Sequence, residues 1–299
     1  MPDPPLAVEI GVDRLAAVRW ARNGSVHDIA VEPLPPGAIV ASAVETNLRD
    51  AEVVRAALSK VCKRLHAENE DVAMLLPDPV IRVFVQHFEE FPRPAEEALP
   101  MLRWKLKKSV PFGVDETLLS YMRQAPREGG VDILTAFARL RIVREYEELA
   151  ESVKLRPGII LSSSLAAVAL LEEHKTTLLA RVSDTVLTTA IVRDGILCAY
   201  RCTELPARGK DLTPQMLQEE IFPATVYYRE IWNDCIQSIR VAGLNARLPE
   251  FVRPLESEFR CSVKSLLHSA VSEGRIPEHA RPVADSELEG LAGLMMNRN

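Results

Sequence analysis

The sequence predicts a mixed α/β protein in which one structural plan occurs twice along the chain. Segments that alternate apolar and polar residues, as strands do, are interleaved with segments whose apolar residues recur at helical spacing. Each half opens with two or three strands joined by short turns, and helices and further strands follow. The composition agrees, because 47% hydrophobic and 26% charged residues in a chain of 299 are ordinary values for a globular protein of about two domains.

The first half is predicted to begin with a β-meander and to continue into a helix. Asn23-Gly24 is a hairpin signal between two of the strands. Asp50 is a candidate N-cap for a helix over Ala51–Glu68, where apolar residues recur at helical spacing. Strands of this part are predicted at Leu6–Val12, Ala16–Trp20, Ser25–Val31, Val72–Leu76 and Ile81–Phe88.

The segment from about residue 79 to 155 is predicted to form a subdomain inserted in the first half. A helix over Pro94–Ser109 has acidic residues at its start and basic residues at its end, which suits the helix macrodipole. Pro100 should kink this helix or mark its true start. Strands at Leu118–Gln124, Asp132–Arg139 and Gly158–Leu161 and helices at Arg144–Lys154 and Leu165–Glu173, the last capped by Ser164, complete the first half.

The second half is predicted to begin near residue 176, which divides the chain into lobes of residues 1–175 and 176–299. Its opening meander turns at Arg193–Gly195, and Pro214 suits the first turn of a long helix. The predicted strands are Thr177–Val182, Val186–Val192, Ile196–Cys202, Ser238–Ala242 and Ser262–Leu266, and the predicted helices are Thr213–Trp232, Pro249–Phe259 and Ser286–Met296.

Charge and residue usage exclude several classes of function. The net charge of −6 provides no overall attraction to nucleic acid. Five scattered cysteines suit a reducing cytoplasm, and the six isolated histidines indicate no metal cluster. The longest apolar stretch, residues 158–171, is shorter than the ~20 residues that span a bilayer.

No phosphate-loop, nucleophile-elbow, zinc-protease or dinucleotide motif occurs, so no catalytic residue and no metal ligand is assigned. The serines at 162–164 are interpreted as a helix cap.

Several segments resemble a known family. Leu6–Val12 resembles the first phosphate strand of the actin-like ATPase fold, whose plan also contains the doubled meander. Residues 76–121, with a Pro111-Phe112 turn after a helix, resemble the inserted subdomain of the type IV pilus assembly PilM family. Residues 239–263, with their turn at Gly243, resemble the family's closing strand, turn and helix. The resemblance implies an actin-like (ribonuclease-H-like) fold of two lobes, with the subdomain inserted in the first.

The nucleotide site implied by this resemblance departs from the family pattern. It would contain Glu9, Gly11, Asp13 and Gly243. Asp13 is more simply a surface turn residue. The carboxylate of the second phosphate strand is replaced by Arg181, which puts a positive charge at the place of the metal ion, and a glycine is replaced by Ser183. Because glycine lets backbone N–H groups approach phosphate closely, we expect no ATP hydrolysis and no obligatory cofactor. Weak binding of ATP with Mg²⁺ is left open.

The inserted subdomain is the better functional lead. In the PilM family it forms, with the first subdomain, a groove that holds the short cytoplasmic tail of an inner-membrane pilus protein. The resemblance therefore implies capture of a peptide by apolar anchors and backbone hydrogen bonds. The expected contacts are Leu102, Trp104, Leu106, Pro111 and Phe112. The expected function is a cytoplasmic scaffold of a type IV pilus or related secretion assembly, peripheral at the inner membrane through its single-pass partner.

Alternatives are a nucleotide-switched protein that binds ATP through Glu9 and a relocated metal ligand, or the cytoplasmic domain of a type II secretion protein of the same fold. A sugar-kinase-type enzyme is disfavoured, because no carboxylate stands in a glycine-rich frame. The basic run Arg103–Lys108 could contact nucleic acid or anionic lipid, but the acids on the same helix favour a solvated helix end. Self-association is left open.

Overall fold

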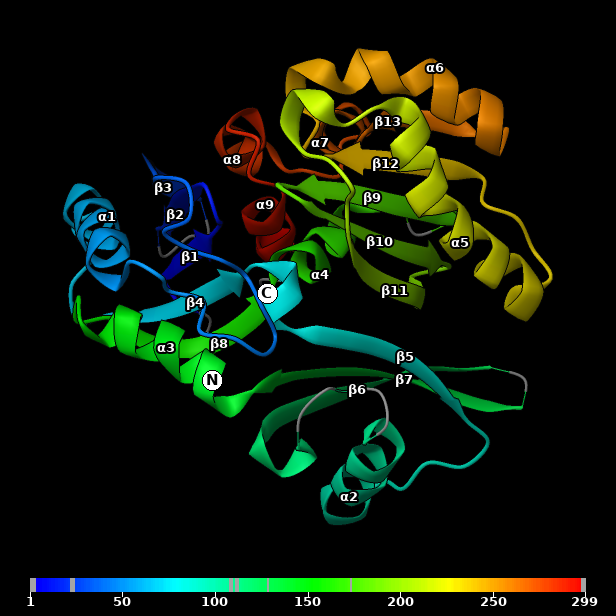
Figure 1. The fold of residues 1–299 in the computed structure, drawn as a ribbon, viewed down its shortest axis with the longest axis horizontal. Helices are drawn as coiled ribbons and strands as arrows, with labels where there is room; N and C mark the ends of the chain where they lie inside the picture. Colours follow the sequence, from blue (N-terminus) through cyan, green and yellow to red (C-terminus); the bar gives the residue numbers. More distant parts are fainter. Residues whose placement is uncertain are drawn as a thin grey trace.

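The computed structural model of the chain describes residues 4–21, 25–107, 110, 113–127, 129–172 and 174–296. Two five-stranded sheets and one three-stranded sheet organise these residues (Figure 1). Each five-stranded sheet begins with three consecutive antiparallel strands. The first of these strands also pairs in parallel with a fourth strand, and the fourth strand pairs in parallel with a fifth. The predicted doubled plan is therefore confirmed. The Asn23-Gly24 turn lies outside the described residues.

The first lobe consists of the sheet of order β3-β2-β1-β4-β8 and the helices α1 and α3. Its strands are β1 (Leu6–Ile10), β2 (Arg14–Trp20), β3 (Val26–Pro33), β4 (Asp71–Leu76) and β8 (Arg156–Ser162). Helix α1 (Ala51–Arg64) is capped by the Asp50 side chain, which accepts a hydrogen bond from the Val53 N–H at 3.1 Å, as predicted. Helix α3 (Leu140–Glu151) buries its apolar face, including Tyr146, in the same core as β1 and α1. Thus α3 packs with the first lobe, although the predicted insert included it.

The insert is a three-stranded antiparallel sheet of order β5-β7-β6. Its strands are β5 (Arg82–Phe88), β6 (Thr117–Arg127) and β7 (Gly130–Arg139). Helix α2 (Ala95–Leu106) covers one face, with Leu102 in a small core against Phe88 and Ile133. Because α2 begins at Ala95, Pro100 lies inside it and does not mark its start. The Gln124 side chain links the insert to the second lobe by two hydrogen bonds, of 2.9 and 2.8 Å, with the backbone of Leu197.

The second lobe is the sheet of order β11-β10-β9-β12-β13 with the helices that flank it. Its strands are β9 (Thr177–Ser183), β10 (Val186–Arg193), β11 (Ile196–Glu204), β12 (Ser238–Ala242) and β13 (Ser262–Ser265). Helices α5 (Pro214–Trp232) and α6 (Leu248–Phe259) pack on one face of this sheet (Figure 1). The predicted bounds of β12 are confirmed, and α5 begins at Pro214, directly after the predicted start at Thr213.

Three helices occupy the other face of the second sheet and reach the first lobe. They are α7 (Leu266–Ser272), α8 (Arg281–Asp285) and α9 (Glu289–Met296), of which only the last was predicted, with an earlier start. Helix α9 lies between the lobes (Figure 1) and packs on α4 (Ser163–Ala167). The contact is close, because a Cβ added at Gly293 would lie 2.1 Å from the Ala166 carbonyl oxygen. The cap of α4 is Ser162, whose side chain accepts from the Leu165 N–H, and not Ser164 as predicted.

Candidate functional site

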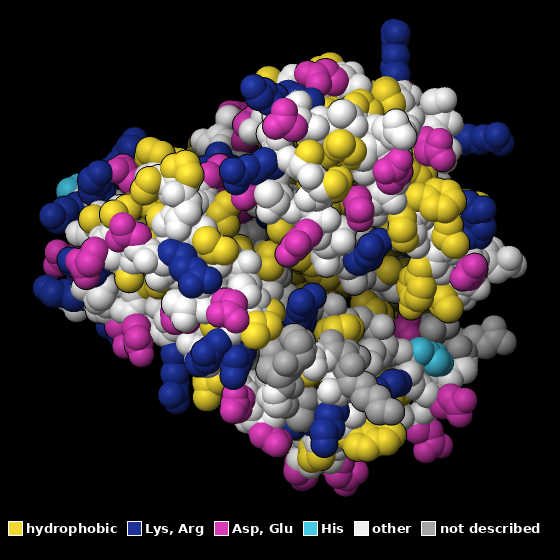
Figure 2. Space-filling model, in the orientation of Figure 1, with side chains coloured by type: hydrophobic (Ala, Val, Ile, Leu, Met, Phe, Trp, Pro, Cys, Tyr) yellow, Lys and Arg dark blue, Asp and Glu magenta, His cyan; other side chains and the backbone are white. Residues whose placement is uncertain are grey.

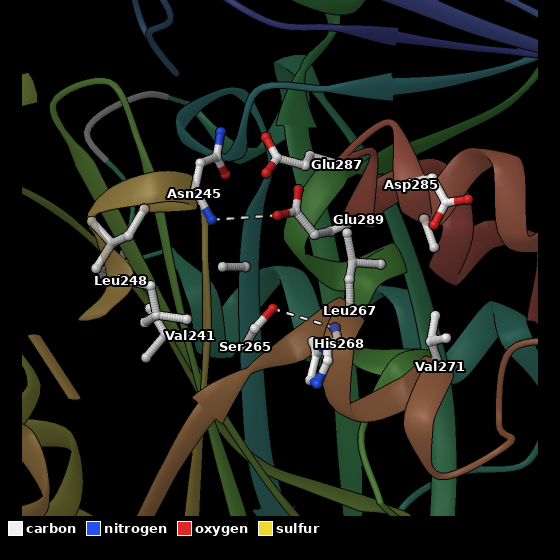
Figure 3. Close-up of a pocket in the computed structure, with 14 residues that line it drawn as sticks. Val241, Asn245, Leu248, Ser265, Leu267, His268, Val271, Asp285, Glu287 and Glu289 are labelled. Carbon is white, nitrogen blue, oxygen red and sulfur yellow. Dashed lines mark hydrogen bonds between the residues drawn. The ribbon is translucent and has the colours of Figure 1, made fainter.

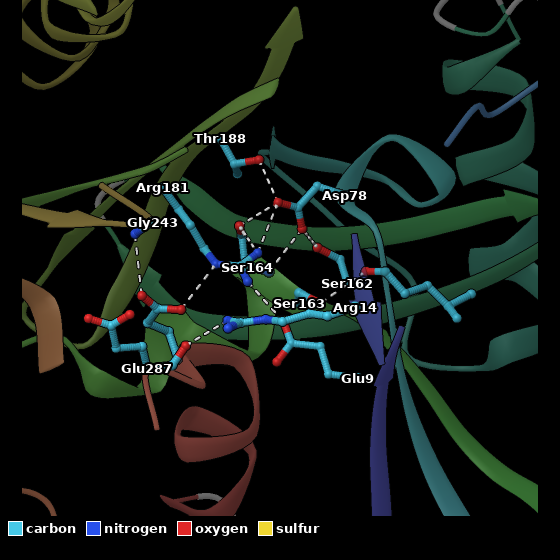
Figure 4. A network of polar contacts seen from close by, with 12 residues as sticks. Glu9, Arg14, Asp78, Ser162, Ser163, Ser164, Arg181, Thr188, Gly243 and Glu287 are labelled. Atoms are coloured by element: carbon cyan, nitrogen blue, oxygen red, sulfur yellow. Dashed lines mark hydrogen bonds and ion pairs between the residues drawn. The ribbon is translucent and has the colours of Figure 1, made fainter. Parts of the chain in front are cut away.

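The central strands of the two large sheets, β1 and β9, carry opposite charges near their ends, at the junction of the lobes. Glu9 on β1 and Arg181 on β9 are each only 8% exposed. The Arg181 Nη2 donates a hydrogen bond to Glu9 Oε1 at 2.8 Å (Figure 4). The neighbouring residue Ala180 belongs to the core under α5. Because side chains alternate between the two faces of a strand, the Arg181 side chain points away from that core. This ion pair therefore joins the two lobes directly.

Two more carboxylates surround the same guanidinium. Asp78 Oδ2 lies 3.7 Å from Arg181 Nη1, and Glu289 Oε2 lies 3.9 Å from Arg181 Nε. Burial lowers the pKa of Arg181, but the charges of Glu9, Asp78 and Glu289 outweigh burial and raise that pKa above its usual value. Arg181 is therefore a permanent cation. Three acidic side chains and one basic side chain meet here in a place with little access to water.

Asp78 is the best-satisfied acid of the cluster. It follows β4, in the short turn Asp78–Val80, and its side chain is 1% exposed. Its carboxylate accepts hydrogen bonds from Ser162 Oγ at 2.5 Å, from the Ser164 N–H at 2.9 Å and also from Ser164 Oγ (Figure 4). From the second lobe, Thr188 Oγ1 donates to it at 2.7 Å. Asp78 thus accepts hydrogen bonds from donors of both lobes, which offset the cost of removing its carboxylate from water.

Glu289 is the first residue of α9 and is 5% exposed. Its carboxylate accepts a hydrogen bond from the Gly243 N–H at 3.3 Å, and burial raises the pKa of Glu289. The neighbouring residue is close to the cluster as well, because a Cβ added at Gly290 would lie 2.9 Å from a carboxylate oxygen of Glu9 and that side chain would have to shift. Helix α9 therefore brings the third acid to the junction by packing almost directly on the Glu9 side chain.

The four residues predicted for a nucleotide site separate into two pairs. Glu9 and Gly243 belong to the network around Arg181. Gly11 and Asp13 lie in the β1–β2 turn, where the Gly11 N–H donates to the Arg14 carbonyl at 2.9 Å and the exposed Asp13 lines a cavity. Gly243 has φ +79°, and a Cβ there would lie 1.8 Å from the carbonyl oxygen of Val182. Backbone packing therefore explains this glycine without a ligand.

The magnesium–nucleotide complex that the resemblance implies does not fit these residues. The N–H groups of Gly11 and Gly243, which would be needed to cradle phosphate, donate to acceptors of the chain itself. The acidic side chains around Arg181 would repel a phosphate, and the guanidinium would repel a metal ion. In the part of the chain that the structure describes, no group of three or more His, Cys, Asp or Glu side chains is placed to hold a metal.

The residues predicted to contact a partner are in different environments. Leu102 and Leu106 are 0% and 1% exposed, because they face the core beneath α2, so they are not surface anchors as predicted. Trp104 is 79% exposed on the same helix. Helical periodicity alone places residues 102 and 106 on one face and residue 104 on the other. Pro111 and Phe112 lie outside the described residues.

Two cavities adjoin the charge cluster. The first, of about 300 Å³, lies at the carboxyl ends of β12 and β13 and is lined by Gly243, Asn245, His268 and Glu289 among others (Figure 3). The second, of about 700 Å³, lies between the lobes and is lined mainly by residues 34–44 of the first lobe and by the β9–β10 turn of the second. Glu289 lines the first cavity and Asp78 lines the second, so the cluster separates them.

Sequence reasoning missed Asp78 and Glu289 as members of this site. A signal for each was present, since Asp78 stands between two prolines after a buried strand, and Glu289 is a lone acid in an apolar helix. Acids in such places are rarely buried unless paired. Neither signal says which cation is the partner, because Arg181 lies about a hundred residues from either acid in the chain. Only the packing of the lobes brings them together.

Comparison with known proteins gives the fold. No protein-family model and no curated protein matches the chain. A solved structure of the "PilM-PilN type IV pilus biogenesis complex" is similar at 17% identity with a TM-score of 0.79, covering 99% of this chain and 98% of that one. A Bacteroides thetaiotaomicron protein with an actin-like ATPase fold gives 9% identity and a TM-score of 0.53, covering 87% and 90%. The cytoplasmic domain of EpsL, from the type II secretion system of Vibrio cholerae, is similar at 11% identity with a TM-score of 0.51. The likeness covers 89% of this chain and 98% of that one.

The chain has the actin-like fold. These likenesses and the doubled sheet order agree on that fold, and they confirm the predicted fold class.

No helix among the described residues is both long enough and apolar enough to cross a membrane. On the face drawn in Figure 2, basic and acidic side chains are interspersed, and no large area of one sign is visible.

Proposed function

We propose that this protein is a cytoplasmic scaffold of a type IV pilus or related secretion assembly, which works at the inner membrane without ATP hydrolysis. It holds the short cytoplasmic tail of a single-pass membrane partner. The observation that carries the proposal is the likeness to the PilM–PilN complex structure along 99% of the chain, insert included. The likeness to the cytoplasmic domain of EpsL, an inner-membrane component of a secretion system, supports the same class of role.

The charge cluster supports independence from nucleotide. Arg181 forms ion pairs with three carboxylates of the chain. The N–H groups of Gly11 and Gly243 donate hydrogen bonds to acceptors of the chain. A nucleotide would have to displace these contacts before it could bind. Because a charge-assisted hydrogen bond contributes about 1.5–3 kcal/mol, the displacement would weaken nucleotide binding strongly.

We place the tail on the insert, along the edge strand β6. Leu118 and Met122 on β6 are 46% and 55% exposed. They share a sheet face with Ala138 and Leu134, which pack against the cores of the lobes. Strand β6 pairs with β7 on one side and has no strand on its other side in the described chain. An extended peptide could add to this edge and cover both side chains, so Leu118 and Met122 replace Leu102 and Leu106 as the proposed anchors.

A binding experiment tests this function. The cytoplasmic tail of a candidate single-pass membrane partner is synthesised with a fluorophore, and its affinity for this protein is measured by anisotropy. We expect Met122→Asp to weaken binding at least tenfold, because a buried charge without a partner costs more than ~1.4 kcal/mol. Phe222→Asp is the matched control, since Phe222 is 50% exposed on the second lobe. A tail that does not bind, or that binds both variants equally, would contradict the proposal.

Nucleotide binding is the second candidate, and the cavity of about 300 Å³ beside Gly243 is the observation in its favour. Calorimetry with Mg-ATP separates the two. Heat of binding with a micromolar Kd would replace the nucleotide-independent scaffold by a nucleotide-switched one. No heat at millimolar Mg-ATP would agree with the proposal.

A further inference from the structure

The larger cavity, of about 700 Å³ between the lobes, has an apolar wall that is already formed. The wall is the loop of residues 34–44, and its apolar lining residues are Leu34, Pro36, Ile39, Val40, Ala41, Ala43 and Val44. Backbone hydrogen bonds hold the loop, from the Leu34 N–H to the Asp13 carbonyl at 2.7 Å and from the Val40 N–H to the Asn47 carbonyl at 2.9 Å. A cavity of this volume is typical of small-molecule sites. The wall therefore offers apolar surface without rearrangement.

Arg82, the first residue of β5, lines the same cavity and is unpaired within the described chain. Its Nε is buried, and its guanidinium forms no ion pair and no hydrogen bond with any described residue. Arg139, Arg181 and Arg240 also bury an Nε that has no hydrogen-bond partner, but each of them pairs with a carboxylate. A cation that is partly withdrawn from water is costly when it is unpaired. An anion that entered the cavity would offset that cost.

The other charges of this cavity do not neutralise Arg82. The acids that line it are Asp13, Asp78, Asp184 and Glu204. Asp78 lies 3.7 Å from Arg181, and Asp184 lies 3.6 Å from Arg208, so these two acids are compensated. The other two acids are exposed, where water weakens their charges. One guanidinium therefore remains for a ligand, and it suits a single negative charge better than the two charges of a phosphate.

We propose that this cavity binds a small molecule that has one carboxylate and an apolar body. The carboxylate pairs with the Arg82 guanidinium, whose planar fork of N–H donors suits the two oxygens of a carboxylate. The apolar body lies against the loop of residues 34–44, opposite residues 183–186 of the second lobe, which also line the cavity. This site does not depend on the tail, which we place on β6.

Calorimetry with octanoate, octan-1-ol and octylammonium tests the charge that the site requires. The three probes share an alkyl chain and differ in the charge of the head group. We expect the parent protein to bind octanoate at least about tenfold more tightly than the other two, because only the carboxylate pairs with a guanidinium. Arg82→Met should weaken octanoate binding by about tenfold or more and should not weaken octan-1-ol binding.

Arg208→Met is the matched control. Arg208 lines the same cavity, but its side chain is 66% exposed and is paired with Asp184. Its loss should change octanoate affinity by no more than about twofold, because an exposed arginine contributes little to an ion pair. Equal weakening in Arg208→Met and Arg82→Met would show general attraction to positive charge and would overturn the assignment of Arg82.

Thermal unfolding separates an arginine that binds a ligand from one that stabilises the fold. Because Arg82 is unpaired in the described chain, Arg82→Met should not lower Tm in the absence of octanoate. Octanoate should raise the Tm of the parent protein and not that of the variant. A lower Tm of Arg82→Met without ligand, no heat with millimolar octanoate, or equal affinity for octanoate and octylammonium would each overturn the inference. Displacement of octanoate by the tail would assign the carboxylate to the partner and overturn the small-molecule site.

Discussion

Two buried arginines on adjacent strands of the second sheet have different roles. Arg240 on β12 is paired with Glu172 and Glu273, whose side chains are 13% and 34% exposed. Arg181 on β9 is paired with three acids whose side chains are at most 10% exposed. Arg240 fastens the sheet to segments that flank it, whereas Arg181 connects the sheet to the other lobe.

The difference shows how the surroundings of an ion pair decide what the pair contributes. The partners of Arg240 reach water, so they can be solvated if the arginine is lost. The acidic partners of Arg181 do not reach water, so after loss of the arginine they would remain buried and unpaired. Breaking a buried pair by removing one partner costs more than the pair itself contributes, because the remaining charge stays desolvated. Substitutions of the residues in these contacts test the contrast.

Replacement of either arginine by methionine should destabilise the protein to different extents. We expect Arg181→Met to reduce the free energy of unfolding by about 3–5 kcal/mol. Arg240→Met should cost about 1.5–3 kcal/mol, the contribution of hydrogen bonds to a charged group. Urea unfolding monitored by circular dichroism gives both values. Equal losses for the two variants would mean that exposure of the partner acids does not matter here.

The close contact of α9 with α4 gives the next prediction. Gly293→Ala places a Cβ against the Ala166 carbonyl oxygen, at 2.1 Å in the unrelaxed structure. Helix α9 must shift, and we expect a loss of about 1–3 kcal/mol in stability, as for an overpacked core. Gly113→Ala is the control, since a Cβ there meets nothing within 4 Å. If the two variants unfold at the same urea concentration, the contact between α9 and α4 is looser than described.

Glu289 should produce a smaller effect that depends on pH. Its pKa is raised in the folded protein by burial, although Arg181 opposes that shift. The folded state therefore binds more protons than the unfolded state above about pH 4.5, and this group lowers stability as pH rises through that window. Glu289→Gln removes the dependence, so the variant should gain stability relative to the parent between pH 5 and pH 8. Unfolding curves at several pH values test the sign, and a gain in the opposite direction would refute the assignment.

Trp104 should give the smallest change in stability. Its side chain is 79% exposed on α2, outside the core of the insert. We expect Trp104→Ala to change the free energy of unfolding by no more than about 0.5 kcal/mol. Leu102→Ala, two positions earlier and fully buried, should cost about 2–5 kcal/mol. A large loss for Trp104→Ala would show that the ring is covered in solution.

Much of the fold could be predicted from the sequence, because it depends on local patterns. The Asp50 cap, the Pro214 in the first turn of α5 and the strand at Ser238–Ala242 each follow from a few neighbouring residues. Helices α7 and α8 were not predicted, since they are only seven and five residues long and the Ser265 cap of α7 lies inside the predicted strand Ser262–Leu266. The anchors assigned to Leu102 and Leu106 were wrong because apolar residues at helical spacing serve a core as well as a groove.

The site was only half predictable. The replacement of a carboxylate by Arg181 could be seen in the sequence, as could Glu9 in the first strand. The acids from the turn after β4 and from α9 could not be assigned, because their meeting depends on how one lobe packs on the other. Exposed Leu118 and Met122 are also a property of tertiary structure, since strand periodicity does not reveal which strand lies at the edge of a sheet.

The position of α9 has a consequence for the order of events during synthesis. A hydrogen bond from Arg14 to the Glu287 carbonyl joins residues 273 positions apart, and the core beneath α9 includes side chains from β1 and β2. The apolar surface of those early strands must stay uncovered on the ribosome until almost the whole described chain has emerged. Nascent chains are made at about 5–20 residues per second, so this surface waits for tens of seconds, and a chaperone that shields apolar surface would find its binding site there.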